Sequence, residues 1–256
     1  MSSKAEDAQL TRSDAPVYVY GVVRSGAVKA PNAEGVAQRP VSTIDGDGLA
    51  ALATELISQP FRVRRRDLDR HLQVLEAVFE DSTIVPCAFG TVLQSAESVK
   101  TDLLAARRDE LLALLDRLED RVQLNIKATY DEDTVLREVV ESDAEIARLR
   151  GESRALGQAG HLANIRLGEL VTTALTARAG ADRQRIGDRL AEHADDVVAD
   201  ETTVPVVLKA SFLVARDRLK SFDSALEALA TDEAPRVMFE SIGPLPPTAF
   251  AALEGA

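Results

Sequence analysis

The residues best suited to chemistry in this 256-residue chain are three histidines and a single cysteine. They are His71, Cys87, His161 and His193. The histidines share no metal-ligand spacing with one another or with Cys87, and the sequence has no CxxC or HExxH motif. A catalytic cysteine needs a neighbouring base and a lowered pKa, and the sequence around Cys87 supplies neither. We therefore expect a buried thiol and structural histidines, with no catalytic residue, cofactor site or metal site.

Two further patterns resemble ligand sites but favour backbone roles. Asp45 and Asp47 alternate with glycines, which is more typical of a turn than of a cation site. Gly151, Gly157 and Gly160 do not follow a strand, and they match neither GxGxxG nor GxxxxGK[ST]. We interpret the first pattern as a turn and the second as a flexible connection between helices.

The one dense basic patch consists of Arg62, Arg64, Arg65 and Arg66. On an exposed edge strand, such charges protect the sheet against association with another sheet. A docking site for an acidic partner is the alternative interpretation. Nucleic acid is a poor candidate, because only 4% of the residues are aromatic and no stacking motif accompanies the arginines.

A proline-rich segment closes the sequence. Pro244, Pro246 and Pro247 restrict the backbone, so this segment is expected to be stiff and extended. Phe250 then either fills the core or, with the prolines, presents an apolar surface to a partner at little ordering cost. These four residues join the arginines as the candidate partner-binding residues.

The composition restricts the class of protein. A net charge of -12, from 30 basic and 42 acidic residues, argues against tight binding to nucleic acid or an anionic membrane. One cysteine excludes an internal disulfide. The polar opening lacks the apolar stretch of a signal peptide, and no segment approaches the ~18 apolar residues of a membrane span. We expect a cytoplasmic protein.

The elements that must position these residues begin after a loose tail at residues 1–15. A strand at 17–23 is apolar on both faces, which is typical of a sheet covered on both sides. Asp67 can cap a helix whose expected apolar stripe is Leu68, Leu72, Leu75 and Phe79. Further strands are expected at 41–44, 61–66, 83–86 and 89–93, and helices at 49–57 and 95–118.

The second half of the sequence is expected to contain fewer strands and more helices than the first half. We expect strands at 122–130, 205–214 and 236–242, and helices at 131–150, 162–178, 184–200 and 217–230. This order resembles a ferredoxin-like half with an enlarged helical insertion. We therefore predict an α+β protein with two domains, an N-terminal mixed α/β unit at 16–118 and a C-terminal ferredoxin-like unit at 119–256. The helical insertion spans 131–200.

Three stretches, in order, match one family pattern. Residues 17–23 read VYVYGVV, similar to an opening YVYGIV strand. Residues 71–93 read HLQVLEAVFEDSTIVPCAFGTVL, similar to H-x-x-V-L-E…V-L-P-x-R-F-G-T. Residues 209–250 contain KASFLVARDRLKSFDSALEAL and then ESIGPLPPTAF, similar to a strand, a helix and a closing G-P-x-P-P-Y-S-F. The chain thus resembles the gas vesicle GvpL/GvpF family over residues 17–253, with Ala88 in place of an arginine and Thr248 in place of an aromatic residue.

The resemblance implies a non-enzymatic accessory protein, cytoplasmic and associated with gas vesicles. It implies binding to the small hydrophobic shell protein and to other gas vesicle accessory proteins. An unassembled shell subunit exposes apolar surface that aggregates. We expect the insertion at 131–200, or the sheet face beside it, to cover that surface. The alternatives are a small-molecule enzyme on a ferredoxin-like scaffold, and an interaction module unrelated to gas vesicles.

Overall fold

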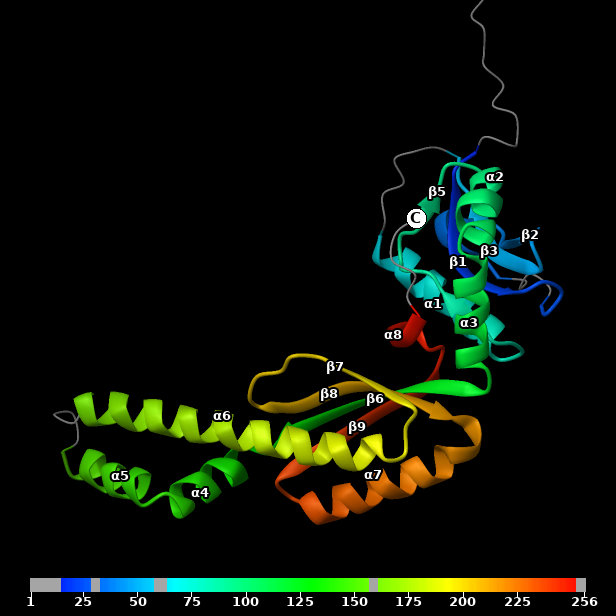
Figure 1. Ribbon diagram of the computed structural model, residues 1–256. Helices are drawn as coiled ribbons and strands as arrows, with labels where there is room; N and C mark the ends of the chain where they lie inside the picture. Colours follow the sequence, from blue (N-terminus) through cyan, green and yellow to red (C-terminus); the bar gives the residue numbers. More distant parts are fainter. Residues whose placement is uncertain (1–14, 29–32, 58–63, 157–160, 252–256) are drawn as a thin grey trace, which may run out of the picture. The chain divides into compact units, whose positions relative to one another are not determined.

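The computed structural model describes residues 15–28, 33–57, 64–156 and 161–251 (Figure 1). The chain divides into two compact units, each built around its own sheet. The first unit comprises Met1–Val122 together with Leu245–Ala256, and the second comprises Gln123–Pro244. The described residues form a mixed α/β fold with two antiparallel sheets and eight α-helices.

The sheet of the first unit has the strand order β2-β3-β1-β4, and β5 also pairs with β1. Its central strand β1 is buried along almost its whole length, as its two apolar faces predicted. The strands are β1 (Val17–Arg24), β2 (Ser42–Gly46), β3 (Leu49–Glu55), β4 (Val85–Pro86) and β5 (Val92–Leu93).

Strand β3 corrects the helix predicted at residues 49–57. Asp47 and Gly48 both adopt positive φ angles, 54° and 80°, which is the geometry of a two-residue hairpin turn. The turn therefore joins β2 to β3 as an antiparallel pair, with Gly46 opposite Leu49. Six successive residues of β3 are buried, so both faces of this strand are covered, whereas a surface helix would bury only one side.

The helices of the first unit are α1 (Arg65–Phe79), α2 (Ala96–Ser98), α3 (Arg108–Leu118) and α8 (Thr248–Ala251), with a π-helical segment at Val99–Ala105. The buried side of α1 differs from the predicted apolar stripe. Asp67 and His71 face the core, whereas Leu68 and Leu72 are exposed. The tyrosines of β1 account for the inward position of His71, because the Tyr18 hydroxyl is its hydrogen-bond partner and the Tyr20 ring stacks on its imidazole. Residues 64–66 are also not the predicted strand, and 61–63 lie outside the described residues.

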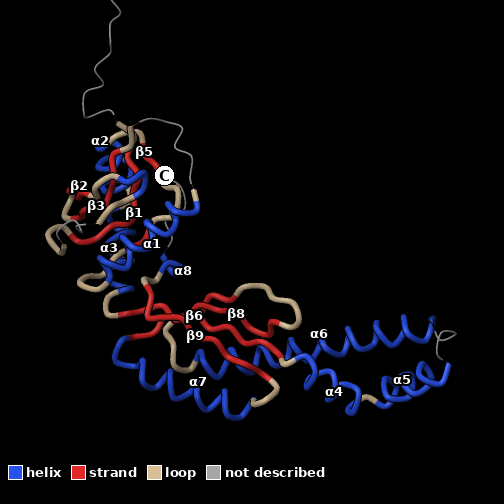
Figure 2. The backbone as a smooth tube through the Cα atoms, turned by 180° about the vertical axis from the view of Figure 1, so that it is seen from behind, coloured by secondary structure: helices blue, strands red, loops and turns tan. Residues whose placement is uncertain are grey.

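The sheet of the second unit has the strand order β7-β8-β6-β9. Figures 1 and 2 show helices α6 and α7 against the same face of this sheet, while α4 and α5 lie alongside the part of α6 that extends beyond it. The strands are β6 (Arg121–Tyr130), β7 (Asp196–Ala199), β8 (Val206–Ala215) and β9 (Val237–Leu245). The helices are α4 (Glu132–Ser142), α5 (Ala144–Leu156), α6 (His161–Ala191) and α7 (Leu219–Glu233).

Three predictions of helix boundaries within the insertion were wrong. The helix expected at 131–150 is interrupted at Asp143, so α4 and α5 take its place. The loop expected around Gly180 is part of α6, because Ala179, Asp182 and Ile186 continue one buried helical face through it. The helix expected to reach residue 200 ends at Ala191. The residues after it form β7, which pairs antiparallel with β8.

The C-terminal segment belongs to a different unit from the one predicted from the sequence. The sequence placed residues 119–256 in one C-terminal domain, but Leu245–Ala256 groups with the first unit. Helix α8 packs against β4, and Phe250 and Ala251 are buried there. The chain therefore returns to the first unit after completing the second sheet.

Candidate functional site

One face of the four-stranded sheet is covered by α6 and α7, and no described helix of the second unit covers the other (Figure 1). The alternation of side chains along β6 separates the two faces. Leu124, Ile126 and Ala128 are buried, whereas Asn125 and Lys127 are partly exposed. We name the uncovered side the open sheet face.

The open sheet face exposes apolar side chains from both edge strands. Met238 and Ile242 of β9 are 56% and 59% exposed, and Val198 of β7 is 41% exposed. Val198 belongs to this face because it pairs with Ser211, which lines the same face. Single exposed apolar residues are ordinary on protein surfaces. Three on one uncovered sheet face are typical of a surface that contacts another molecule.

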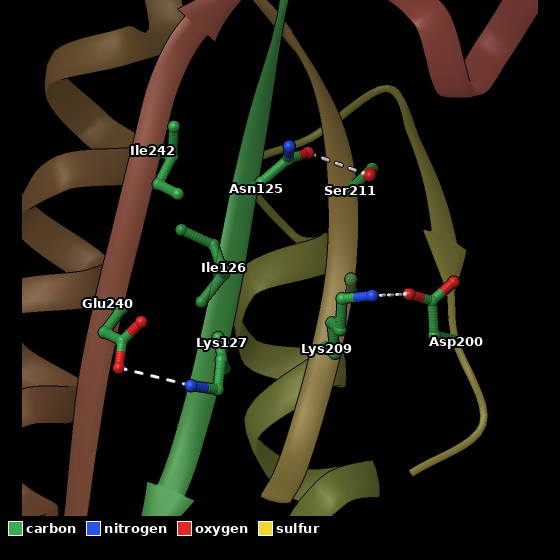
Figure 3. A pocket seen from close by; sticks show the side chains of 9 residues that line it. Asn125, Ile126, Lys127, Asp200, Lys209, Ser211, Glu240 and Ile242 are labelled. Carbon is green, nitrogen blue, oxygen red and sulfur yellow. Dashed lines mark hydrogen bonds and ion pairs between the residues drawn. The ribbon is translucent and has the colours of Figure 1, made fainter. Parts of the chain in front are cut away.

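Two ion pairs cross the same face between neighbouring strands (Figure 3). Lys127 Nζ lies 3.3 Å from Glu240 Oε1, and Lys209 Nζ lies 2.7 Å from Asp200 Oδ2. All four side chains are substantially exposed, so each pair contributes little to stability. They can exchange their partners for polar groups of another polypeptide at small cost.

A depression of about 250 Å³ lies on this face. Asn125 Oδ1 accepts a hydrogen bond from Ser211 Oγ at 2.9 Å (Figure 3). It also accepts a hydrogen bond from Gln123 Nε2 at 2.8 Å. The depression is lined by Asn125, Ile126, Lys127, Asp200, Lys209, Ala210, Ser211, Glu240 and Ile242. Its volume is below the ~300–1,000 Å³ typical of small-molecule sites, so the geometry favours contact with an extended surface.

The predicted partner-binding residues are divided between the two units. Arg62 lies outside the described residues, whereas Arg64, Arg65 and Arg66 are exposed around the start of α1. Pro244 is exposed near the end of β9. Arg64, Arg65 and Arg66 belong to the first unit and are therefore not part of the open sheet face, whereas Pro244 belongs to the second unit.

The second half of the closing motif requires a correction. Pro246, Pro247 and Phe250 are buried in the first unit, and Phe250 is only 8% exposed. They therefore pack the core and present no broad apolar surface to a partner. This agrees with the packing interpretation of the motif.

The two reactive side chains of the first unit, His71 and Cys87, are buried, and His71 lies among aromatic rings. His71 Nδ1 lies 2.9 Å from the hydroxyl of Tyr18, and the His71 ring stacks on Tyr20 with the ring centroids 5.7 Å apart. Burial lowers the pKa of His71 from 6.5 to about 4, so the imidazole is neutral at pH 7. Burial raises the pKa of the Cys87 thiol to about 12, which keeps it protonated.

The other two histidines lie in the second unit. His193 Nδ1 is 2.8 Å from Ser221 Oγ in an exposed pair, and His161 is exposed at the start of α6. The described residues contain no group of three or more His, Cys, Asp or Glu side chains that could hold a metal ion. Among the described helices, none is both long enough and apolar enough to cross a membrane.

A buried ionic network on the covered face was missed from the sequence. Asp182 of α6 accepts hydrogen bonds from Tyr130 at 2.6 Å, Arg236 at 2.6 Å and Arg185 at 2.9 Å. Both arginines also pair with Glu233 at the end of α7. Burial alone would raise the pKa of Asp182, but the hydrogen bonds from Tyr130 and Arg236 outweigh it and hold this pKa below its usual value. The network fixes α6 and α7 against the sheet that carries the open face.

Comparison with known proteins identifies relatives along almost the whole chain. The family model described as "Gas vesicle synthesis protein GvpL/GvpF" matches residues 16–252. Gas vesicle protein F of a Streptomyces species is 32% identical over 236 residues, which cover 91% of this chain and 98% of that protein. Gas vesicle protein F of Dolichospermum flosaquae is 24% identical over 93% of this chain and 98% of that protein.

Two solved structures have the same fold. The crystal structure of GvpF from Anabaena sp. matches with a TM-score of 0.80 and 24% identity, over 93% of this chain and 99% of that chain. The crystal structure of GvpF from Microcystis aeruginosa matches with a TM-score of 0.71 and 24% identity, over 93% of this chain and all of that chain.

Proposed function

Because the chain belongs to the gas vesicle synthesis protein GvpL/GvpF family, we propose that it assists assembly of the gas vesicle shell by binding the small hydrophobic shell protein. We assign this contact to the open sheet face. The observation that supports the assignment is the combination of three exposed apolar residues, Val198, Met238 and Ile242, with two exposed ion pairs on one uncovered surface.

The chemistry of this surface suits temporary binding. An unassembled shell subunit must hide apolar surface from water, and the exposed side chains of β7 and β9 offer an apolar contact for it. The exposed ion pairs surrounding that contact favour orientation more than affinity. The net charge of -12 keeps the complex soluble. A subunit held in this way can be released to the growing wall.

Contacts with other accessory proteins would use a different surface. The exposed cluster of Arg64, Arg65 and Arg66 in the first unit is our candidate for an acidic partner. Pro244 is exposed at the end of β9 and remains a second candidate. We propose that the protein acts in the cytoplasm in association with gas vesicles, with no nucleic acid or membrane partner.

We further infer that the chain has two domains and that the second unit is ferredoxin-like. Support comes from the order of its elements, in which β6 is followed by three helices, then by β7, β8, α7 and β9. The spatial strand order β7-β8-β6-β9 is the one that a ferredoxin-like sheet requires. Helices α4, α5 and the first part of α6 form the enlarged insertion.

The competing proposal of a small-molecule enzyme has less support. An active site needs convergent polar groups around a well-formed pocket. The depression of about 250 Å³ is smaller than the ~300–1,000 Å³ of typical small-molecule sites, and the charged residues around it pair with one another. We therefore propose a binding protein without a reaction centre.

A cellular experiment tests the proposed function. A strain lacking the gene is complemented with the wild-type chain or with a chain carrying Met238→Ser and Ile242→Ser, and vesicles are counted by electron microscopy. We expect the wild-type chain to restore vesicles and the double variant to restore few. Normal vesicle numbers in the strain lacking the gene, or full rescue by the variant at equal protein level, would contradict the proposal.

A further inference from the structure

The outer face of α1 combines basic and apolar side chains. Leu68 and Leu72 are 37% and 40% exposed, and Arg64 and Arg65 are exposed one turn earlier. Arg65, Leu68 and Leu72 recur at i, i+3 and i+7, so they lie along one side of the helix. We name Arg64, Arg65, Leu68 and Leu72 the basic face.

The position of the arginines does not serve helix stability. The N-terminal end of a helix carries a partial positive charge, which disfavours cationic side chains there. The described residues provide no ion pair to Arg64 or Arg65, whereas Arg70, one turn later, pairs with Glu34. An external partner with negative charge would relieve this concentration of positive charge.

Helix α4 repeats the same spacing with the opposite charge. Asp133, Leu136 and Val140 also recur at i, i+3 and i+7, and Glu132 precedes them as Arg64 precedes Arg65. Leu136 is 36% exposed and Val140 is half-buried. The inner side of α4, represented by Val139, is buried towards α6. We name Glu132, Asp133, Leu136 and Val140 the acidic face.

We propose that the basic face of one molecule binds the acidic face of a second copy of this chain. With the two helices parallel, Arg65 meets Asp133, Leu68 meets Leu136, and Leu72 meets Val140. Charge complementarity selects this occupant, because both surfaces share one spacing and carry opposite charge. This inference rests on the proposed partner-binding role of the arginine cluster and names a second copy of this chain as the acidic partner. It is independent of shell-protein binding on the open sheet face.

The proposed contact is head-to-tail. Each molecule offers a basic face in its first unit and an acidic face in its second unit, so successive copies add in one direction. The contact is small, since it rests on four residues from each side, and we expect weak, reversible association. Because charge contributes to it, association should weaken as the salt concentration rises.

Reciprocal charge reversal tests the proposal. One variant carries Arg64→Glu and Arg65→Glu, and the other carries Glu132→Arg and Asp133→Arg. Sedimentation velocity is measured for full-length chains at low salt over concentrations up to the millimolar range. We expect the wild type to self-associate, and each variant alone to lose at least about tenfold in association constant. An equal mixture of the two variants should associate again, because each mixed contact then joins opposite charges.

A control variant with Arg154→Glu and Lys220→Glu changes the net charge as the first variant does, on exposed residues of α5 and α7 that lie outside both faces. It should associate as the wild type does, and circular dichroism should show that all variants remain folded. A further variant of the basic face, Leu68→Ser with Leu72→Ser, should weaken association without any change in net charge. Monomeric wild type at every concentration would overturn the proposal, and so would mixed variants that do not associate.

Discussion

The hydroxyl group of Tyr18 lies 2.9 Å from Nδ1 of His71, although the two residues are 53 positions apart in the sequence. The backbone N–H of Gly90 donates to the same hydroxyl at 3.2 Å. Tyr18 belongs to the first stretch that predicted the family, and His71 and Gly90 belong to the second. These two stretches therefore meet in the core of the first unit, where they serve packing and hydrogen bonding rather than partner contact.

The neutral state of His71 predicts an acid sensitivity. In the unfolded chain this histidine takes up a proton near pH 6.5, and in the folded chain near pH 4. Between these values the unfolded state binds more protons, so the free energy of unfolding falls as the pH falls. The difference corresponds to about 3 kcal/mol, lost between pH 6.5 and 4.

The variant His71→Gln tests this expectation, because glutamine forms hydrogen bonds but does not titrate. The variant should be less stable at pH 7, and its disadvantage should shrink as the pH approaches 4. Two of the three tyrosines in the chain lie in this cluster, and the chain has no tryptophan, so near-ultraviolet circular dichroism during denaturation follows it. A disadvantage that stays constant from pH 7 to 4 would show that His71 does not cause the acid sensitivity.

The network around Asp182 predicts a large effect of Asp182→Asn. The substitution removes the less exposed arginine, Arg236, and its neighbour Arg185 from one of the two carboxylates that they share, so that only Glu233 still pairs with both. We expect a loss of about 2–4 kcal/mol in the free energy of unfolding of the second unit. Asp232→Asn is a matched control on α7, because its ion pair with Arg189 is exposed and should be worth less than about 1 kcal/mol. Equal effects in urea denaturation would contradict the assigned role.

The continuity of α6 predicts that Gly180→Ala stabilises the protein. A Cβ atom at this position meets no atom within 4 Å, and alanine favours helix over glycine. We expect a gain of up to about 1 kcal/mol, measured by thermal unfolding. A clear loss would indicate a break in the helix at this glycine, as the sequence alone had predicted.

The opposite result is expected for Gly21→Ala in β1. A Cβ atom there would lie 2.7 Å from the carbonyl oxygen of Val85 and 2.9 Å from the side chain of Ile84. Since the backbone of β4 pairs with β1 at this point, relief requires the strands to separate. We expect a loss of about 1–3 kcal/mol in thermal unfolding. Wild-type stability would contradict the close approach of the two strands.

The sequence predicted elements well where local pattern and tertiary context agree. The doubly apolar run at 17–23 became the buried strand β1, and the turn residues at 45–48 form a turn. The helix predicted after them was wrong, because the burial of β3 on both faces depends on the layers that cover the sheet and not on a local sequence pattern. Likewise, the helical spacing predicted that Leu68 faces the core, but His71 faces the core beside the tyrosines of β1 and Leu68 is exposed.

The open sheet face could not be predicted from the sequence. Its residues come from four strands spread between Gln123 and Pro244, and only the order β7-β8-β6-β9 brings them together. Strand β7 lies within the helix predicted at 184–200, so Val198 was not expected on a sheet. The alternation of exposed Met238, Glu240 and Ile242 along β9 was the one local signal available.

The most direct measurement compares how much co-expressed shell protein three forms of the full-length chain retain in a pull-down. They are the wild type, Met238→Ser with Ile242→Ser on the open sheet face, and Leu162→Ser with Ile165→Ser on exposed positions of α6. We expect the sheet variant to retain at least about tenfold less shell protein than the wild type, and the α6 variant to match the wild type. Undiminished retention by the sheet variant, or a loss confined to the α6 variant, would contradict binding through the open sheet face.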